Sequence, residues 1–258
     1  MDTLADVLSR AREHDGAVLD APDRRTPHSY REFATGAWKA GNLLRHYGVR
    51  PGSRVGLVVG PKSPGGEDEP GRLGDAADPL LALFGAAAVG ATVEVTLDPP
   101  VDARALVLPD AWLGRYDVSP GCSRIAYGGP PDLPGVAHFE RERWSENPTE
   151  PPGSVAPGDA VLRTDNREFT HADLVDAADG VVRDHGLETG DTVAVDAPLT
   201  SAGTVVAGVV APLVAGATIQ PVGGATADWD GVAYAVRAGG GENGGGDGDV
   251  IDPSAVIC

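Results

Sequence analysis

The sequence is poor in cysteine, and this argues against both a disulfide framework and a cysteine-based metal site. Its 258 residues include two cysteines, Cys122 and Cys258. Two isolated thiols give neither the paired spacing of a zinc site nor the several bridges of a small secreted domain. We assign no metal-ligating residue and expect surface or helix-cap roles for the histidines, which are scattered singly: His14, His28, His46, His138, His171 and His185.

Lysine is almost absent, and the charge balance is strongly acidic. Lys39 and Lys62 are the only lysines, and 38 Asp and Glu residues oppose 20 Lys and Arg residues, which gives a net charge of −18. An acidic surface repels nucleic acid and anionic membranes, so we expect neither as a partner. Because the acidity is spread along the chain, we interpret it as adaptation to a salt-rich cytoplasm; a regulatory protein that avoids acidic partners is the alternative.

Long apolar runs are missing as well. The longest, residues 204–219, is interrupted by Gly208, Pro212 and Gly216 and is too short to span a membrane. The first residues, MDTLADVLSRAREHDG, show an amphipathic helix pattern rather than a signal peptide. We therefore expect a cytoplasmic protein.

Aromatic residues are few, whereas small aliphatic residues are abundant. Aromatics make up 5% of the chain and hydrophobic residues 41%, mostly as Ala and Val. A core of this composition suits packed α/β layers, in which buried strands read as continuous aliphatic runs.

An internal repeat is the clearest pattern in the chain. The segment YREFATGAWKAGNLLRHYGVRPGSRV from Tyr30 corresponds to EFTHADLVDAADGVVRDHGLETGDTV from Glu168, with Gly48 matching Gly186. Each copy is later followed by an apolar, helix-like segment that ends in Gly-Ala-Thr. Each copy thus predicts a helix, a tight turn, a buried strand, a second helix and a parallel strand.

The repeat and the composition divide the chain into four segments. Between the copies the sequence is rich in Pro and Gly, and near the C-terminal end it reads GGGENGGGDGD. We expect a first α/β subdomain at 1–112, an irregular bridging segment at 113–158, a second subdomain at 159–237 and a flexible Gly-rich tail at 238–258.

Several stretches resemble the acyl-adenylate-forming enzymes, the superfamily of acyl-CoA synthetases and related AMP-forming ligases. The run DAPDRRTPHSYREFATGAWKAGNLLRHYGVRPGSRVGLVV is similar to the opening of those enzymes, and LLALFGAAAVGATVEV to their helix before a Gly-Ala-hydrophobic strand. PGDAVLRTDNREFTHADLVDAA and APLTSAGTVVAGVVAPLVAGATIQPV resemble the segment around their signature loop and the helix and strand beyond. The resemblance covers about residues 16 to 222. It implies an α/β fold of two similar subdomains, with mostly parallel sheets flanked by helices, like the family's N-terminal domain.

The signature loop itself is lost. The family grips the ATP phosphates with a loop of the form Thr-Ser-Gly-Thr-Thr-Gly-x-Pro-Lys-Gly, whereas here RTDNREF leads directly into Thr170 and His171. The glycines and the lysine are absent, and Asp165 and Glu168 place carboxylates where phosphate would lie. Thr164 and Thr170 are either remnants of the loop or, for Thr170, the N-cap of the following helix.

Other parts that the resemblance implies are missing too. Ser201 stands where the family has an aromatic residue or His, and the adenine motif, the ribose-binding Asp and the domain with the catalytic Lys have no counterpart in this sequence. We therefore assign no catalytic and no cofactor-binding residue, and no cofactor. We expect a non-catalytic acyl-CoA synthetase-like protein that binds an acyl or CoA-like ligand, regulates a full-length acyl-CoA ligase or self-associates. The alternatives are a subunit of a split AMP-forming ligase, which would join an acid to a thiol, and a structural interaction protein without ligand.

The interpretation of the acidity makes a testable prediction. Salt screens the mutual repulsion of the carboxylates, so the midpoint of thermal unfolding should rise when NaCl is increased from about 0.1 M to about 3 M. Calorimetry across this range would measure the effect. A midpoint that does not change with salt would contradict the interpretation.

Overall fold

The computed structural model describes residues 1–20, 25–66, 68–165, 167–222, 231–238 and 249–257. The helices of this part lie in chain order at α1 (Leu4–Ala11), α2 (Tyr30–His46), α3 (Asp78–Val89), η1 (Asp110–Arg115), α4 (Phe139–Ser145), α5 (His171–His185), α6 (Ala202–Val205), η2 (Val206–Val210), α7 (Ala211–Ala215) and η3 (Pro253–Ala255). The strands lie at β1 (Ala17–Leu19), β2 (His28–Ser29), β3 (Arg54–Leu57), β4 (Thr92–Glu94), β5 (Ala105–Pro109), β6 (Ser123–Tyr127), β7 (Val136–His138), β8 (Ala160–Thr164), β9 (Arg167–Thr170), β10 (Thr192–Asp196), β11 (Thr218–Pro221), β12 (Tyr234–Arg237) and β13 (Asp249–Ile251).

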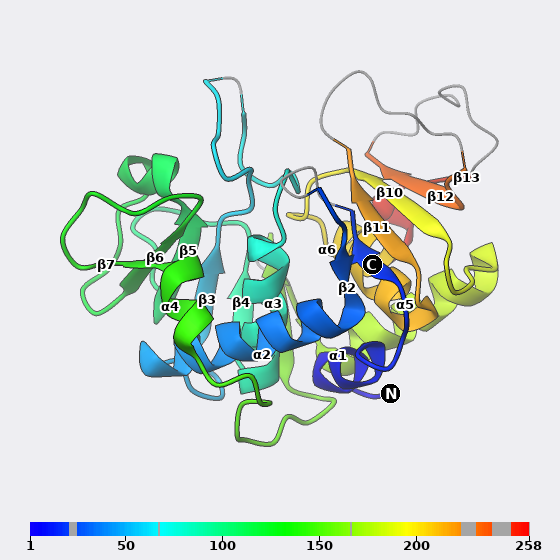
Figure 1. The fold of residues 1–258 in the computed structure, drawn as a ribbon, viewed down its shortest axis with the longest axis horizontal. Helices are drawn as coiled ribbons and strands as arrows, with labels where there is room; N and C mark the ends of the chain where they lie inside the picture. The colour runs from blue at the N-terminus through cyan, green and yellow to red at the C-terminus, as the bar shows by residue number, and fades with distance from the viewer. Residues whose placement is uncertain (21–24, 67, 166, 223–230, 239–248, 258) are drawn as a thin grey trace.

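These strands form two sheets. One sheet has the order β7-β6-β5-β3-β4-β8-β9 and the other β13-β12-β10-β11-β1-β2. Neighbours are parallel except for the pairs β8–β9 and β1–β2. Figure 1 shows the first sheet on the left and the second on the right, with helices packed on them. The predicted fold class, mostly parallel sheets flanked by helices, is confirmed.

The same order of elements occurs in both halves. In the first half α2 leads into β3, and α3 returns the chain to β4, which pairs in parallel with β3. In the second half α5, β10, the helical segment α6–η2–α7 and β11 follow the same course. Both returning helices end at the predicted Gly-Ala-Thr, where Gly90 (φ 78°) and Gly216 (φ 83°) adopt the left-handed conformation. A residue with a Cβ is strained in that conformation, which explains why glycine ends each helix.

Each sheet contains strands from both predicted subdomains. Leu19, inside the predicted first subdomain, pairs with Ile219 of the second sheet. Leu162, inside the predicted second subdomain, pairs with Val93 of the first sheet. The segment 113–158, in which one or two irregular strands were expected around Ile125–Tyr127 and Val136–Phe139, supplies β6 and β7. Both extend the first sheet in parallel, because a strand beside a free edge gains backbone hydrogen bonds. Whether the predicted subdomains fold as separate units stays a prediction.

The predicted flexible tail is wrong for its last part. Residues 239–248 lie outside the described residues, but β13 pairs in parallel with β12, with Val250 opposite Ala235. Ile251 and Pro253 are buried. Residues 249–253 are thus held against the second sheet both by strand pairing and by burial of their apolar side chains.

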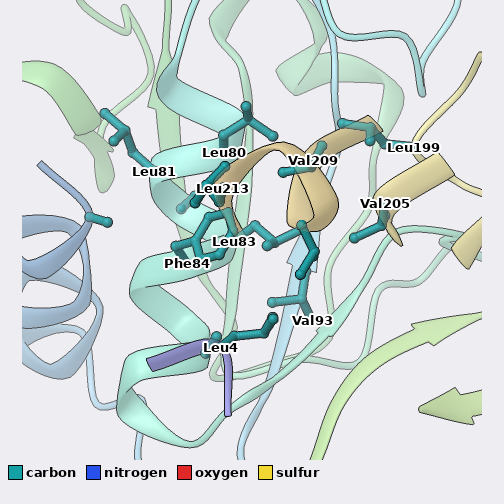
Figure 2. Packing of buried hydrophobic residues seen from close by; sticks show 14 of the residues in the cluster. Leu4, Leu80, Leu81, Leu83, Phe84, Val93, Leu199, Val205, Val209 and Leu213 are labelled. Carbon is teal, nitrogen blue, oxygen red and sulfur yellow. The ribbon is translucent and has the colours of Figure 1, made fainter. Parts of the chain in front are cut away.

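The larger of two clusters of buried hydrophobic residues spans both halves. Every residue of α3 is buried, and its apolar composition leaves no polar face. Figure 2 shows Leu83 and Phe84 of α3 beside Val209 and Leu213 of the helical segment that belongs to the second sheet. None of the helices in the described part of the chain combines the length and the hydropathy that a membrane-spanning segment needs.

Helices α2 and α3 pack closely because glycine faces glycine between them. A Cβ added to Gly85 would lie 2.6 Å from the backbone N of Gly41, and one added to Gly41 would lie 2.7 Å from the carbonyl O of Gly85. Both would meet backbone rather than a flexible side chain, so neither clash can be relieved by a rotamer change.

We predict that Gly85→Ala destabilises the protein by about 2–3 kcal/mol, because the new methyl group forces the two helices apart. The matched control is Gly180→Ala on α5, where an added Cβ meets nothing within 4 Å. That substitution should be neutral or should stabilise by about 0.5–1 kcal/mol, because alanine is the better helix former. Denaturant unfolding of the two variants measures both values, and equal stability of the two would contradict the prediction.

Candidate functional site

The position of the expected phosphate loop is taken by a tight hairpin. Strands β8 and β9 pair antiparallel up to Thr164 and Arg167, which leaves Asp165 and Asn166 as the whole connection. Asp165 has φ 46°, a left-handed conformation that Asp tolerates better than most residues. Asn166 lies outside the described residues. The hairpin leads directly into Thr170 and α5.

A hollow of about 200 Å³ lies beside this hairpin. Three parts of the chain line it: the hairpin, the residues that open α6, and the segment after β13. The lining includes Thr164, Arg167, Phe169, Ser201, Gly203 and Ser254. Two of the three walls thus come from parts of the chain that are distant in sequence from the hairpin.

The two carboxylates expected at the phosphate position point to different sides. Asp165 lines the hollow, but the Glu168 carboxylate lies 3.7 Å from the guanidinium of Arg163. Successive side chains of a strand alternate between its faces, so Arg167 and Phe169 line the hollow and Glu168 does not. Of the two carboxylates, Asp165 lines the hollow and Glu168 does not. The guanidinium of Arg167, 5.2 Å from the centre of the Phe169 ring, adds a positive charge that the sequence interpretation overlooked.

A glycine allows the last wall of the hollow to form. Gly203 in α6 lies directly against the carbonyl group of Pro253, where a Cβ would collide with backbone. Asp252 holds this segment in shape by accepting a hydrogen bond from the backbone N–H of Ser254 at 2.9 Å. The sequence interpretation assigned residues 238–258 to a flexible tail. It left open whether the moderately apolar end VIDPSAVIC docks or frays, and it did not place this segment beside the hairpin.

Thr170 is a helix cap. Its hydroxyl accepts a hydrogen bond from the backbone N–H of Asp173 at 3.2 Å, and the Asp173 carboxylate accepts one from the backbone N–H of Thr170 at 2.8 Å. The two bonds form a capping box that satisfies free N–H groups at the start of α5. The N-cap interpretation of Thr170 is confirmed.

His171, the next residue, is fully buried, so a surface role is wrong for it, whereas a cap role is found at the start of α1. Its Nδ1 accepts a hydrogen bond from the backbone N–H of Leu4 at 3.1 Å, and its side chain packs between α1 and the body of the protein. Burial disfavours the charged imidazolium and lowers the pKa of His171 to about 4.

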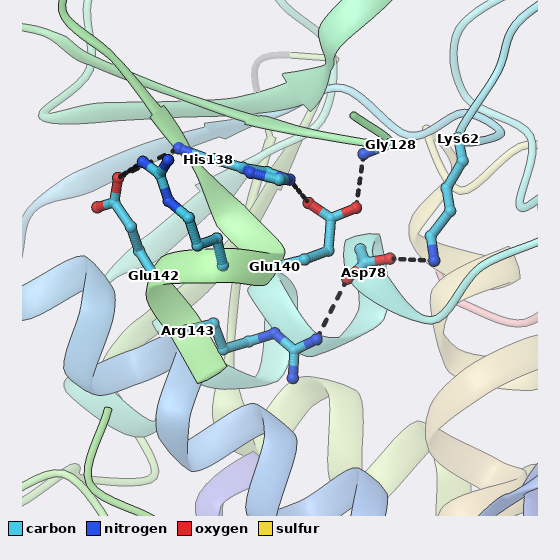
Figure 3. Close-up of polar contacts among 8 residues, drawn as sticks. Lys62, Asp78, Gly128, His138, Glu140, Glu142 and Arg143 are labelled. Carbon is cyan, nitrogen blue, oxygen red and sulfur yellow. Dashed lines mark hydrogen bonds and ion pairs between the residues drawn. The ribbon is translucent and has the colours of Figure 1, made fainter. Parts of the chain in front are cut away.

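A second polar cluster lies at the carboxyl ends of the first sheet's strands, with a buried carboxylate at its centre. Asp78, at the start of α3, lies 3.5 Å from the ammonium of Lys62 and 3.5 Å from the guanidinium of Arg143 (Figure 3). Burial raises the pKa of Asp78, although both cations oppose the shift. Beside it, Glu140 accepts a hydrogen bond from the backbone N–H of Gly128 at 2.7 Å. The cluster joins the loop after β3 to α3 and α4.

Neither cluster is a metal centre. Within the described residues there is no group of three or more His, Cys, Asp or Glu side chains that could hold a metal ion. Cys122, the free thiol in this part of the chain, is half-buried, and burial raises its pKa, which makes it a poor nucleophile.

Comparison with known proteins identifies the fold. No family model and no curated protein sequence matches the chain. Among solved structures, the anthranilate CoA ligase AuaEII in complex with anthranoyl-AMP is 21% identical with a TM-score of 0.69, and 86% of this chain covers 45% of that one. A benzoate CoA ligase from Burkholderia xenovorans is 22% identical with a TM-score of 0.66, with coverages of 86% and 46%. The N-terminal domain of FACL13 from Mycobacterium tuberculosis is 14% identical with a TM-score of 0.63, with coverages of 85% and 57%.

These similarities establish the fold of the N-terminal part of CoA ligases, as the sequence resemblance implied. The chain spans about half the length of these solved proteins. At such low identity the likeness concerns the fold, and the activities of the ligases are properties of those proteins.

The capping box makes a testable prediction. Thr170→Ala removes the acceptor for the N–H of Asp173 and should lower the free energy of unfolding by about 1 kcal/mol, whereas Thr170→Ser keeps the hydroxyl and should cost about half of that or less. Denaturant unfolding distinguishes the two variants. Equal losses for both would show that the Thr170 methyl group, rather than the cap, stabilises this helix start.

Proposed function

We propose that this chain is a non-catalytic acyl-CoA synthetase-like protein, which keeps the scaffold of CoA ligases without their ATP chemistry. The observation that carries the proposal is the two-residue connection between β8 and β9. A phosphate-binding loop needs several glycines whose backbone N–H groups converge on the anion, and a two-residue turn cannot supply them.

The residues beside the hairpin do not fit a nucleotide triphosphate. Strand pairing continues to the residues that flank the turn, so their backbone groups belong to the sheet. The Asp165 carboxylate lines the hollow and repels a polyanion, and the single guanidinium of Arg167 does not outweigh four negative charges. In this proposal the chain therefore neither binds ATP nor catalyses a reaction with it.

The hollow fits a small acyl ligand with an acidic group better than it fits a nucleotide. Arg167 supplies a planar guanidinium that binds a carboxylate through two parallel hydrogen bonds. Phe169 gives an apolar surface for the acyl part, and the hydroxyls of Thr164, Ser201 and Ser254 accept or donate further hydrogen bonds. In this proposal the hollow binds its ligand and leaves it chemically unchanged.

Regulation of a full-length ligase, or self-association, is the second part of the proposal. Trp144 on α4 is 81% exposed, far more than the other large hydrophobic side chains in the described residues. Tryptophan contributes more than most residues to protein interfaces, so this side chain favours a contact with another protein chain.

We expect the purified chain to show no acid-dependent exchange of pyrophosphate into ATP, measured in high salt over a panel of carboxylic acids. Because the missing loop is the reason, added magnesium and excess ATP should not restore exchange. Robust exchange by the pure chain would overturn the proposal, and exchange that appears only after a copurifying protein is added would indicate a split ligase.

Thermal-shift measurements with the same acids and with acyl-CoAs test the hollow. Arg167→Ala should abolish a ligand-induced shift, whereas the control Arg183→Ala, on the exposed side of α5, should leave it unchanged. The absence of any shift in the original chain would favour a structural protein without ligand.

A further inference from the structure

Helix α1 covers the junction between the two halves of the molecule. It contacts α2 and α3 on the side of the first sheet and α5 and α7 on the side of the second. Figure 1 shows it next to α2, near the N-terminal end of the chain. Its apolar residues Leu4, Val7, Leu8 and Ala11 are all at most 1% exposed. Detachment of α1 would therefore expose the hydrophobic residues at the junction between the two halves to solvent.

One hydrogen bond fixes the beginning of this helix to the body. The first N–H groups of a helix have no partner within the helix. Here the N–H of Leu4 donates to Nδ1 of His171, at the start of α5 and 167 positions along the chain, at 3.1 Å. An acceptor at Nδ1 requires a neutral imidazole that carries its proton on Nε2. Nε2 is buried and has no hydrogen-bond partner.

Protonation converts this attraction into repulsion. A proton on Nδ1 would point at the N–H of Leu4, and the bond would be lost while a positive charge is created in a fully buried side chain. Two charged groups face the imidazole: Asp6 from α1 and Asp159 from the turn before β8. Both favour the protonated form, but burial outweighs them. Asp6 is also engaged in the capping box of α1, where it accepts the N–H of Thr3 at 3.0 Å.

We propose that His171 is a proton-operated latch, whose protonation releases α1 from the body while the two sheets remain folded. The proposal concerns conformation and does not depend on the function of the hollow. Release of α1 exposes the apolar faces of α1, α3 and α7 together and thereby opens the junction between the halves.

The direction and size of the pH effect follow from the two states of the imidazole. The pKa of His171 is about 4 in the closed state, whereas a solvent-exposed histidine in the released state has a value of about 6.5. The released state therefore binds the proton more tightly. The latch has its full strength above about pH 6.5, and the released fraction grows roughly sixfold per pH unit as the pH falls from there toward 4.

Hydrogen exchange of the whole chain tests the proposal. Converted to protection factors, the amides of residues 4–11 should lose protection roughly 10-fold between about pH 7.5 and pH 5.5 and on the order of 70-fold by pH 4.5. The amides of α2 should keep theirs. Unchanged protection of α1, or a loss shared equally by α1 and α2, would overturn the latch.

A conservative variant isolates the titrating group. His171→Asn can place its side-chain oxygen near the Nδ1 position but cannot be protonated, so the pH dependence of α1 should disappear. The matched control His46→Asn changes an exposed histidine of α2 and should leave the pH dependence intact. If His171→Asn does not fold, an NMR titration of the original chain gives the answer. A His171 pKa near 4 with the proton on Nε2 supports the latch, and a value near 6.5 overturns it.

Discussion

The backbone contact between α2 and α3 is the constraint on which the rest of the architecture depends. Gly41 and Gly85 allow the two helices to approach without intervening side chains. This approach places α3 deep in the molecule, where all of its residues are buried between its own sheet and the helical segment of the second half. Because a packed core tolerates almost no change of volume, a larger distance between these helices would also displace the second sheet.

Local patterns predicted the elements well because the physical causes are local. The segments GVRPG and GLETG, the two Gly-Ala-Thr endings and the aliphatic runs specify turns, helix ends and strands through backbone conformation and burial. The partners of the strands could not be predicted in the same way. A strand as short as Ala17–Leu19 carries no information about which sheet edge it will join. The apolar pieces that form β6 and β7 predicted strands, but the surrounding Pro and Gly residues gave no sign that they extend the first sheet.

In the candidate site, too, features with local causes could be predicted from the sequence, and those that depend on distant parts of the chain could not. Loss of the phosphate loop and the cap at Thr170 were readable from residue types alone. The orientation of Glu168 was also readable, since the alternation of side chains in a strand separates it from Phe169. The burial of His171 was not, because a histidine at the first position of a helix has the same local sequence whether water or another helix covers it. What covers it here is α1, whose Leu4 lies 167 positions earlier in the chain.

The pairing of Leu19 with Ile219 has a consequence for the order in which this protein acquires its structure during synthesis. The strands of the first sheet are all present once residue 170 has emerged from the ribosome, but β1 must wait for β11. At about 5–20 residues per second, the intervening stretch takes on the order of 10–40 s to make. Throughout that interval a short apolar strand near the beginning of the chain has no parallel partner. Contacts between residues so distant in sequence form slowly, and the pairing of β1 with β11 is such a contact.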